Sequence, residues 1–287
     1  MIQLEQELLS CHTTFRIGGA ATYYLIPEKE EEITEAVAFA KKKKLPFYIL
    51  GKGSNVLFSD NGYSGVVIEI GKGLEGMEIH PDGIVEAQAG IALSAMAAQL
   101  AEAGLTGFEF AGGIPGTLGG AITMNAGAYG GEIKDCIQSA TVLTSEGRIL
   151  TLKKEELALG YRTSVIPEEK YIVLSGCFSF EKGEKEEILA TMKELGKRRR
   201  EKQPLEYPSA GSTFKRPEGH FAGKLIEDAG LRGYRVGDAQ VSEKHCGFVV
   251  NRGEATAAEV RQVIADVQTK VKETFGVELE PEIRLVE

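Results

Sequence analysis

The residues from 111 to 131, AGGIPGTLGGAITMNAGAYGG, form a glycine-rich stretch of the kind that can hold a ligand against the backbone. Glycine lacks a Cβ and readily adopts positive φ angles, so successive N–H groups can point toward one anion. The stretch lacks the Gly-Lys-Ser/Thr ending of a P-loop and the G-x-G-x-x-G spacing of a dinucleotide-binding fold. Taken alone, it predicts either a site for a flat or phosphorylated ligand or a tightly turning loop without one.

A second glycine-containing segment, LGKGSN at residues 50–55, follows the apolar run 47–50, which predicts a buried strand. A strand that runs into Gly-x-Gly-Ser-Asn presents backbone and hydroxyl donors at its end, which suits a pyrophosphate group. Each segment is a weak signal by itself. Because both occur in the first half of the chain beside apolar structure, they support each other as parts of a phosphate-binding site.

Three further polar motifs carry residue types that take part in catalysis. Arg162 in GYRTS has a planar fork suited to a carboxylate, Ser212 in AGSTFK sits beside a glycine where a ligand can approach, and Glu282 in PEIR places a carboxyl group on the closing strand. Each has a plainer explanation, namely a surface ion pair, a turn hydroxyl and a solvent-facing carboxylate. Their spacing alone does not bring them together.

The composition argues against several classes of protein. A formal net charge of -9 does not suit a nucleic-acid or anionic-membrane surface, and the basic run 197–200 is interpreted as a solvated helix face. The four cysteines form no C-x-x-C pair and only four histidines are present, so no metal site is expected. No window reaches the roughly 18 apolar residues of a membrane span, and the N-terminus lacks a signal-peptide pattern. These features predict a cytoplasmic protein.

The elements that would position these motifs follow from hydrophobic periodicity and turn residues. A helix at 30–44 begins with Glu and ends with Lys, as the helix dipole favours, and lies between strands at 22–26 and 47–50. With a strand at 66–70, these elements predict a small α/β unit. Further strands are expected at 77–79, 84–87, 137–144, 149–152 and 171–180, and helices at 93–103 and 184–202.

A domain boundary is expected near Lys202, where a largely charged helix gives way to a proline-punctuated segment. The residues beyond it predict a compact α+β unit. Its expected elements are a short helix at 221–228, strands at 247–250 and 282–286, and a helix that opens at Thr256 with Glu259 in capping-box position. One face of that helix is apolar and comprises Val260, Val263, Ile264, Val267 and Val271.

Seven motifs, in unbroken order from about Thr13 to the C-terminus, resemble the UDP-N-acetylenolpyruvoylglucosamine reductase (MurB) family of peptidoglycan synthesis. They are TFRIGG (14–19), LGKGSN (50–55), GGIPGTLGGAITMNAGAYG (112–130), YRTS (161–164), AGSTFKRP (210–217), GFVVN (247–251) and PEIRL (281–285). The glycine-rich segments alone would indicate only the wider FAD-binding superfamily that includes vanillyl-alcohol oxidase. YRTS, GSTFK and PEIRL narrow the resemblance to the reductase.

The resemblance implies an α+β protein with a two-subdomain FAD-binding fold of the vanillyl-alcohol oxidase type, followed by a small α+β substrate-binding domain. The expected boundaries are 1–72 for the first FAD-binding subdomain, 73–202 for the second, and 203–280 for the substrate-binding domain. The C-terminal strand at 281–287 is expected to join the second subdomain. The chain resembles the shorter type of the family, without an extra tyrosine-bearing loop, and is expected to be a monomer.

The resemblance also implies non-covalently bound FAD, NADPH as the electron donor, and UDP-N-acetylglucosamine enolpyruvate as the substrate, which is reduced to UDP-N-acetylmuramate. No nucleic acid or membrane partner is expected. The residues that match the flavin-binding segments are Gly51, Lys52, Gly53, Ser54, Asn55, Gly113, Ile114, Pro115, Gly116, Thr117, Gly119, Gly120, Asn125, Ala126, Gly127 and Ala128.

By motif match, Ser212 resembles the family's general acid, and Arg162 and Glu282 its other catalytic residues. Reduction of an enolpyruvyl group pushes negative charge into its carboxylate, which a fixed Arg and a hydrogen-bonding carboxyl group would stabilise. A hydroxyl over the adjacent carbon can then donate the proton. Softer matches to substrate-binding residues are Tyr161, Lys202, Lys215 and His245. Arg216 replaces an asparagine of the longer type, which leaves the grip on the UDP pyrophosphate open.

Two other functions stay open on the residues alone. A different FAD oxidoreductase of the same fold, such as an alcohol oxidase, would share both glycine-rich segments. A non-catalytic nucleotide or phosphosugar binder would retain flavin without oxidising NADPH. The motifs from both halves of the chain favour the reductase.

Overall fold

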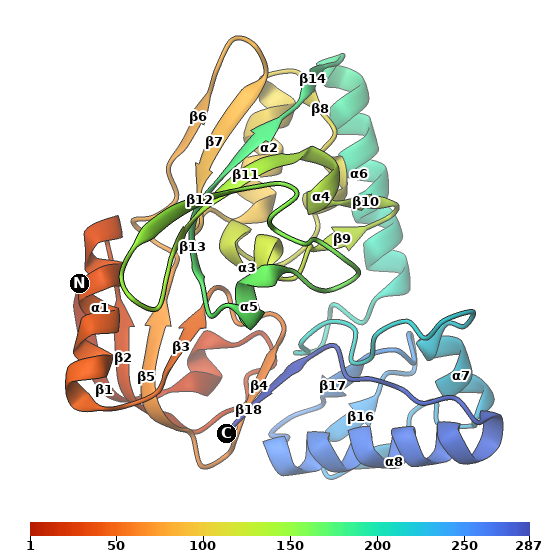
Figure 1. Cartoon of the computed structure of the whole chain (residues 1–287). Helices are drawn as coiled ribbons and strands as arrows, with labels where there is room; N and C mark the ends of the chain where they lie inside the picture. The colour runs from red at the N-terminus through yellow and green to blue at the C-terminus, as the bar shows by residue number, and fades with distance from the viewer. The chain divides into compact units, whose positions relative to one another are not determined.

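The computed structural model describes all 287 residues, Met1–Glu287, and the chain falls into two compact units. Unit 1 comprises Met1–Leu4, Tyr24–Lys52 and Val66–Arg199. Unit 2 comprises Glu5–Tyr23, Gly53–Gly65 and Arg200–Glu287. Figure 1 shows the helices and strands, labelled where there is room and coloured from red at the N-terminus to blue at the C-terminus.

A four-stranded sheet of order β1-β2-β5-β3 contains the strands predicted for the first α/β arrangement. Its strands are β1 (Ile2–Leu8), β2 (Ala20–Ile26), β3 (Phe47–Leu50) and β5 (Tyr63–Glu69). β3 and β5 run parallel, with Phe47 opposite Val66. The predictions at 22–26, 47–50 and 66–70 are confirmed. β1 is an additional strand that the periodicity does not predict, because none of its residues is fully buried.

The helix α1 (Glu30–Lys43) forms where its periodicity predicts it. Its buried residues include Ile33, Val37 and Ala40 at helical spacing, and its first turn is acidic while its last turn is basic. Lys44 follows with a left-handed φ of 56°. Its N–H donates to helix carbonyls, which satisfies the end of the helix and turns the chain into β3.

An antiparallel sheet of order β12-β11-β13-β7-β6 forms the centre of unit 1 and is drawn in orange and green in Figure 1. Its strands are β6 (Met77–Ile79), β7 (Ile84–Gln88), β11 (Ile137–Leu143), β12 (Ile149–Lys153) and β13 (Ile172–Ser179). The sequence predicts all five. In β13, a Cβ at Gly176 would lie 2.7 Å from Phe178 Cε2 and 3.0 Å from Ile122 Cδ1. Glycine there lets the helix that carries Ile122 pack directly on the sheet.

The remaining elements of unit 1 are short apart from two helices. The helices are α2 (Leu93–Glu102), α3 (Leu118–Thr123), α4 (Ile133–Cys136), α5 (Val165–Glu168) and α6 (Lys185–Lys202), whose last three residues belong to unit 2. The short strands are β8 (Leu105–Thr106), β9 (Gly127–Ala128), β10 (Gly131–Glu132) and β14 (Glu181–Lys182). Two 3₁₀ turns complete the set, at Leu9–His12 in unit 2 and Glu109–Ala111 in unit 1. The predicted helices at 93–103 and 184–202 are confirmed.

Unit 2 packs a long helix, α8, against a three-stranded antiparallel sheet of order β15-β16-β17. Its elements are β4 (Val56–Phe58), α7 (Ala222–Asp228), β15 (Arg235–Val236), β16 (Ala239–Val241), β17 (Val249–Asn251), α8 (Ala257–Phe275) and β18 (Arg284–Val286). The apolar face predicted for α8 is confirmed, since Val260, Val263, Val267 and Val271 are all 0% exposed. These residues form the centre of the unit's apolar core.

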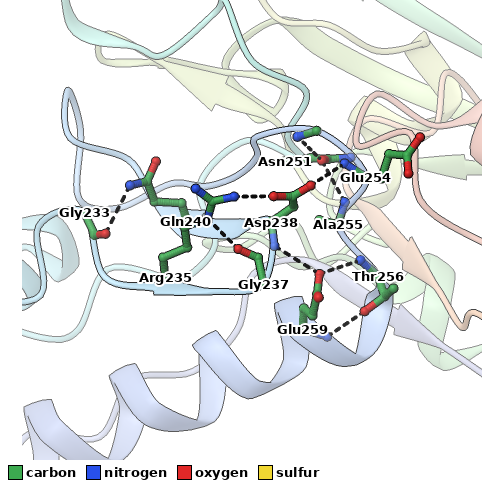
Figure 2. A network of polar contacts seen from close by, with 11 residues as sticks. Gly233, Arg235, Gly237, Asp238, Gln240, Asn251, Glu254, Ala255, Thr256 and Glu259 are labelled. Carbon is green, nitrogen blue, oxygen red and sulfur yellow. Dashed lines mark hydrogen bonds and ion pairs between the residues drawn. The ribbon is translucent and has the colours of Figure 1, made fainter.

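The start of α8 is tied to the β15–β16 turn by a network of polar contacts (Figure 2). The predicted capping box is present, because Thr256 accepts from the Glu259 N–H and Glu259 accepts from the Thr256 N–H. Glu259 also accepts from the Asp238 N–H, and the Asp238 carboxylate accepts from the Glu254 N–H. The start of α8 is therefore fixed both by its own capping box and by its contacts with the β15–β16 turn.

The last strand differs from its expected place. β18 pairs in parallel with β4, Arg284 lying opposite Val56, whereas the sequence analysis joined residues 281–287 to the subdomain at 73–202. Strand partners in a parallel pair come from distant parts of the chain, so local pattern does not identify them. The division into three domains at 72 and 202 stays a prediction.

None of the helices combines the length and the apolar character needed to cross a bilayer. No group of three or more His, Cys, Asp or Glu side chains is arranged to hold a metal ion. All four cysteines are free thiols. Burial raises the pKa of Cys136 to about 12 and also raises the pKa of Cys246, so neither offers a thiolate nucleophile at neutral pH.

Candidate active site

The two glycine-rich segments meet within unit 1. Gly51 follows β3, and a Cβ on it would lie 2.3 Å from Thr117 Oγ1, which is closer than any real Cβ contact. Thr117 stands directly before α3 and is only 4% exposed. The two glycine-rich segments therefore contact each other here, and the contact requires glycine at position 51.

Backbone donors next to this contact have no acceptor in the chain. The N–H groups of Leu118 and Gly119 donate to the carbonyls of Ile91 and Ala89 at 2.9 and 2.8 Å, which holds the segment in place. The N–H groups of Gly116 and Thr117 make no such bond. A fixed pair of N–H donors that the chain itself does not use suits the oxygens of a bound phosphate. The residues present thus fit the diphosphate of a dinucleotide cofactor.

The rest of the first glycine segment belongs to unit 2. Gly53 has a φ of 59°, and a Cβ on it would lie 2.2 Å from the His12 carbonyl oxygen. Its own carbonyl accepts from the Thr14 N–H at 3.1 Å. Asn55 donates from Nδ2 to the Glu282 carbonyl at 3.2 Å, which links a predicted flavin residue to the segment of a predicted catalytic residue.

Arg162 lies against the second glycine-rich segment in unit 1. Its Nη2 donates to the Gly127 carbonyl at 3.3 Å, and its Cζ lies 5.4 Å from the centre of the Tyr161 ring. The backbone of Arg162 is left-handed, with a φ of 56°, a conformation that costs a non-glycine residue about 1 kcal/mol or more. The surrounding contacts therefore hold a strained residue in a defined place.

The side chain of Asn125 makes the hydrogen bonds that hold the region around Arg162 in place. The residue is 1% exposed, and its Nδ2 donates to both Glu132 Oε2 and the Gly160 carbonyl at 2.9 Å. Its Oδ1 accepts from the Lys134 N–H at 2.9 Å. Asn125, predicted as a cofactor residue, thus joins the glycine-rich segment to the chain on the N-terminal side of Arg162.

The carboxylate beside Asn125 is held ionised. A hydrogen bond from Lys134 is the largest cause that lowers the pKa of Glu132, followed by the hydrogen bond from Asn125, while the charge of Arg162 adds to the effect. On the other side of Arg162, Ser164 donates to the Thr123 carbonyl at 2.7 Å. The region around Arg162 is therefore fixed at both ends.

In unit 2, one buried threonine connects the segments of three predicted site residues. Thr213 is 2% exposed and follows Ser212 directly. Its N–H donates to the Gly247 carbonyl at 2.8 Å, its carbonyl accepts from the Glu282 N–H at 2.8 Å, and its Oγ1 accepts from the Val249 N–H at 2.9 Å. Ser212 and Glu282 are thereby placed on adjacent stretches of main chain, as their predicted partnership requires.

His245 stands on the loop that Thr213 contacts. Its Nδ1 accepts from the Gly247 N–H at 3.1 Å, so the neutral ring carries its proton on Nε2 and can donate from there. Burial, together with the positive charge of Lys202, lowers the pKa of His245. A neutral imidazole donor close to a lysine suits an anionic ligand.

The other predicted residues are less engaged. Lys215 forms an ion pair with Glu280 on the last segment of the chain, and Lys202 is exposed at the end of α6. Tyr161 is 49% exposed. Arg162 thus lies with the predicted flavin-binding segment 125–128 in unit 1, whereas the segments of Ser212, Glu282 and His245 are joined in unit 2.

Arg199 lies at the candidate site, although its sequence context does not predict it there. The basic run 197–200 is interpreted as a solvated face, but Arg199 lies against the glycine-rich segment, its Cδ 3.2 Å from the position of a Cβ on Gly113. Burial lowers the pKa of its guanidinium, and no carboxylate lies within ion-pair distance. Met192, two helical turns earlier, lies in the same way against Gly112. That seven-residue spacing is the signal that could have identified the buried face.

Comparison with known proteins supports the same interpretation. Residues 21–153 match the model of an FAD binding domain, and residues 203–286 match the model of the UDP-N-acetylenolpyruvoylglucosamine reductase C-terminal domain. The curated UDP-N-acetylenolpyruvoylglucosamine reductase of Lachnoclostridium phytofermentans is 58% identical over 283 residues, which span 98% of this chain and 91% of the relative. That of Agathobacter rectalis is 55% identical over 99% of this chain and 93% of the relative.

A solved structure agrees with both family matches. The crystal structure of UDP-N-acetylenolpyruvylglucosamine reductase (MurB) from Thermus caldophilus superposes with a TM-score of 0.84 at 35% identity, over 100% of this chain and 98% of the other. The α+β chain thus carries an FAD-binding domain followed by a C-terminal α+β domain, as predicted. With relatives this similar over nearly its whole length, the chain belongs to the UDP-N-acetylenolpyruvoylglucosamine reductase family and is an FAD-dependent oxidoreductase.

Proposed function

We propose that the chain reduces the enolpyruvyl ether of UDP-N-acetylglucosamine enolpyruvate to UDP-N-acetylmuramate, a step of peptidoglycan precursor synthesis, with NADPH as the electron donor. Relatives that share nearly the full length carry the reductase name, and this chain carries the FAD-binding match. The observation that carries the proposal is the joining of the Ser212 and Glu282 segments through Thr213. We infer a monomer that acts in the cytoplasm.

The residues proposed to hold FAD are the two glycine-rich segments. Gly51 and Lys52 with Gly113–Gly120 would accept the diphosphate, since the N–H groups of Gly116 and Thr117 are available there. Gly53, Ser54 and Asn55 continue the first segment, and Asn125 to Ala128 continue the second. Bound FAD would supply the hydride.

Arg162 and Glu282 are proposed to stabilise charge on the substrate. When the terminal carbon of the enolpyruvyl group is reduced, negative charge moves into the carboxylate as an enediolate. The guanidinium of Arg162 pairs with that charge, and the carboxyl group of Glu282 stabilises it through a hydrogen bond. Arg162 donates to the Gly127 carbonyl and the main chain of Glu282 is bonded to Thr213, so little reorganisation is needed when the charge develops.

Ser212 is proposed to donate the proton that completes the reaction. Its hydroxyl O–H bond breaks as a C–H bond forms at the carbon next to the carboxylate, and the electron pair of the enediolate is consumed. The serine oxygen regains a proton from solvent. The position of Ser212 is fixed by Thr213 rather than by its own side chain, so the hydroxyl can rotate toward the substrate.

His245 and Lys202 are proposed to contact the diphosphate of the substrate, with Tyr161 and Lys215 as further wall residues. The Nε2–H of neutral His245 and the ammonium of Lys202 both donate to anions. The pairing of Lys215 with Glu280 means that this lysine also carries a structural ion pair.

Steady-state turnover tests the proposed function. The purified, FAD-loaded protein is supplied with NADPH and UDP-N-acetylglucosamine enolpyruvate, and the sugar is analysed by mass spectrometry. The proposal expects NADPH oxidation that depends on the sugar and a product heavier by two hydrogens. Substrate-independent NADPH oxidation, or oxygen consumption with simple alcohols in place of the sugar, would contradict it.

A further inference from the structure

An aromatic ring on the surface of unit 2 is backed by a guanidinium group. Phe221 is 62% exposed, the largest fraction among the exposed large hydrophobic residues of the chain. The Cζ of Arg216 lies 3.8 Å from the centre of the Phe221 ring, within the range of a cation–π contact. With one face of the ring covered by Arg216, the other is available to a flat ligand.

The chain holds this pair in place before any ligand arrives. Arg216 Nε donates to the His220 carbonyl at 3.3 Å, and the His220 N–H donates to the Pro217 carbonyl at 3.1 Å. Gly219 supplies the positive φ of 72° that the turn needs. On the far side, the Phe221 carbonyl accepts from the N–H of Lys224 at 3.0 Å as α7 begins. A binding surface organised in advance loses little conformational entropy on binding.

The segment that carries the ring also contacts a candidate anion-binding residue of the same unit. Gly223, two residues after Phe221, lies so close to His245 that a Cβ on it would be 3.4 Å from His245 Cε1 and 3.1 Å from the Gly247 nitrogen. His245 offers its Nε2–H, and the charge of Lys202 reaches it. Phe221 is therefore only two residues from a position that contacts His245, so a flat apolar surface and an anion-binding position both lie at the start of α7.

A nucleoside diphosphate is the chemical class that uses both features. Its phosphates suit His245 and Lys202, and its base has the π face that stacks on an aromatic side chain. We propose that Phe221, backed by Arg216, is the platform on which the uracil ring of the UDP-sugar stacks. The identity of the base rests on the proposed function, whereas the platform itself rests on the geometry of unit 2.

Stacking of this kind binds the substrate without taking part in the reaction. Loss of one base–aromatic stack weakens binding by about tenfold to 100-fold. Since the uracil keeps the same contact in the ground state and the transition state, the loss should appear in KM and leave kcat nearly unchanged.

The experiment compares FAD-loaded wild type with Phe221→Ala, Phe221→Leu and Phe221→Trp. We expect KM for the UDP-sugar to rise about tenfold or more in the Ala and Leu variants, and to stay within about twofold of wild type in the Trp variant. Phe221→Leu keeps an apolar side chain of similar bulk, so it reports the stack even if Phe221→Ala folds poorly. Phe275→Ala removes another exposed ring, 39% exposed at the end of α8, and should leave KM unchanged.

Inhibitors separate the base from the phosphates. The inhibition constant of UDP should rise in Phe221→Leu by the same factor as KM, while that of inorganic pyrophosphate should stay constant. Arg216→Met should raise the constant for UDP by a smaller factor, because the ring remains. An unchanged KM in both Ala and Leu variants, or equal rises for UDP and pyrophosphate, would overturn the platform.

Failure of the proposed function would look different. If wild type does not turn over the UDP-sugar, the reductase proposal fails. Calorimetric titration of UDP into wild type and Phe221→Leu then still tests the platform directly. Equal affinity in the two proteins would overturn it, and an affinity lower by about tenfold in the variant would support it.

Discussion

The two units hold their candidate active-site residues by different means. In unit 1, side chains do this, since Asn125 donates to the Gly160 carbonyl before Arg162, and Ser164 after Arg162 donates to the Thr123 carbonyl. In unit 2, the main chain does it, through the backbone bonds of Thr213 to the segments of Gly247 and Glu282. The difference teaches which substitutions remove chemistry and which remove geometry. Truncating Ser212 should leave its surroundings in place. Truncating Asn125 should instead displace a different residue, Arg162.

The largest expected effect comes from Ser212→Ala. Removing the proposed proton donor should slow reoxidation of the reduced flavin by the UDP-sugar by about 100-fold or more, while NADPH still reduces the flavin at nearly the wild-type rate. Stopped-flow absorbance measures both half-reactions. Ser209→Ala, three residues earlier in the same segment, is the control. Equal losses in both half-reactions would show that the substitution had disrupted the structure of the site and had not simply removed a proton donor.

Gly51→Ala is expected to have the next largest effect, because its Cβ would meet Thr117 Oγ1 at 2.3 Å. Forcing the two glycine-rich segments apart should weaken FAD binding by about tenfold or more, equivalent to about 1.4 kcal/mol. Flavin fluorescence titration of the apoprotein measures this. The double variant Gly51→Ala/Thr117→Ala removes the atom that clashes and should bind FAD more tightly than the single variant. No recovery would argue that the contact is not the cause.

Asn125→Ala tests whether the hydrogen bonds of this side chain hold Arg162 in place in unit 1. Loss of its buried hydrogen bonds should lower the free energy of unfolding by about 1–3 kcal/mol and reduce kcat by about tenfold through misplacement of Arg162. Denaturant titration and steady-state kinetics measure the two effects. The exposed Asn61 of unit 2 provides the control as Asn61→Ala. A stability loss with unchanged kcat would separate Asn125 from the placement of Arg162.

Arg199→Met should have a smaller effect on the same region. The variant keeps much of the apolar stem beside Gly113 but removes a guanidinium that has no carboxylate partner, so FAD affinity should fall severalfold. Arg198→Met on the same helix removes an exposed arginine that pairs with Glu194 and should leave FAD affinity unchanged. Fluorescence titration measures the FAD affinity of both variants. Equal affinities would indicate that Arg199 only packs against the glycine-rich segment.

The smallest expected effect is a pH dependence of stability in unit 2. Burial lowers the pKa of His245 below its ordinary value of 6.5, so the unfolded chain binds a proton at this residue more readily than the folded chain. Stability should therefore fall as pH drops through about 6.5, because protons favour the unfolded state there. Thermal unfolding at pH 7.5 and 5.5 measures this. His245→Gln should reduce the difference in Tm between the two pH values, and an unaltered difference would assign it to other groups.

Much of the fold was predictable because it has regular periodicity. The α8 helix shows its apolar valines and its capping box in the sequence, and the structure places both as expected. β4 and β18 are short strands, and nothing local specifies that they pair with each other. The polar strand β1 exposes most of its residues and so lacks a burial pattern to detect.

The sequence identifies the candidate site residues themselves, but not the residues that hold them in place. The resemblance names Ser212, Glu282 and Arg162, yet Thr213 gives no signal of its own, because its role depends on three partners distant in the sequence. Arg199 was obscured by neighbouring basic residues, although its spacing from Met192 marks the face that lies on the glycine-rich segment.

An anaerobic single turnover tests the central claim most directly. The FAD-loaded protein is reduced with one equivalent of NADPH, UDP-N-acetylglucosamine enolpyruvate is added, and flavin absorbance is followed at its band near roughly 450 nm. The account predicts rapid return of the oxidised spectrum together with formation of UDP-N-acetylmuramate. Flavin that NADPH reduces but that stays reduced in the presence of the sugar would contradict it.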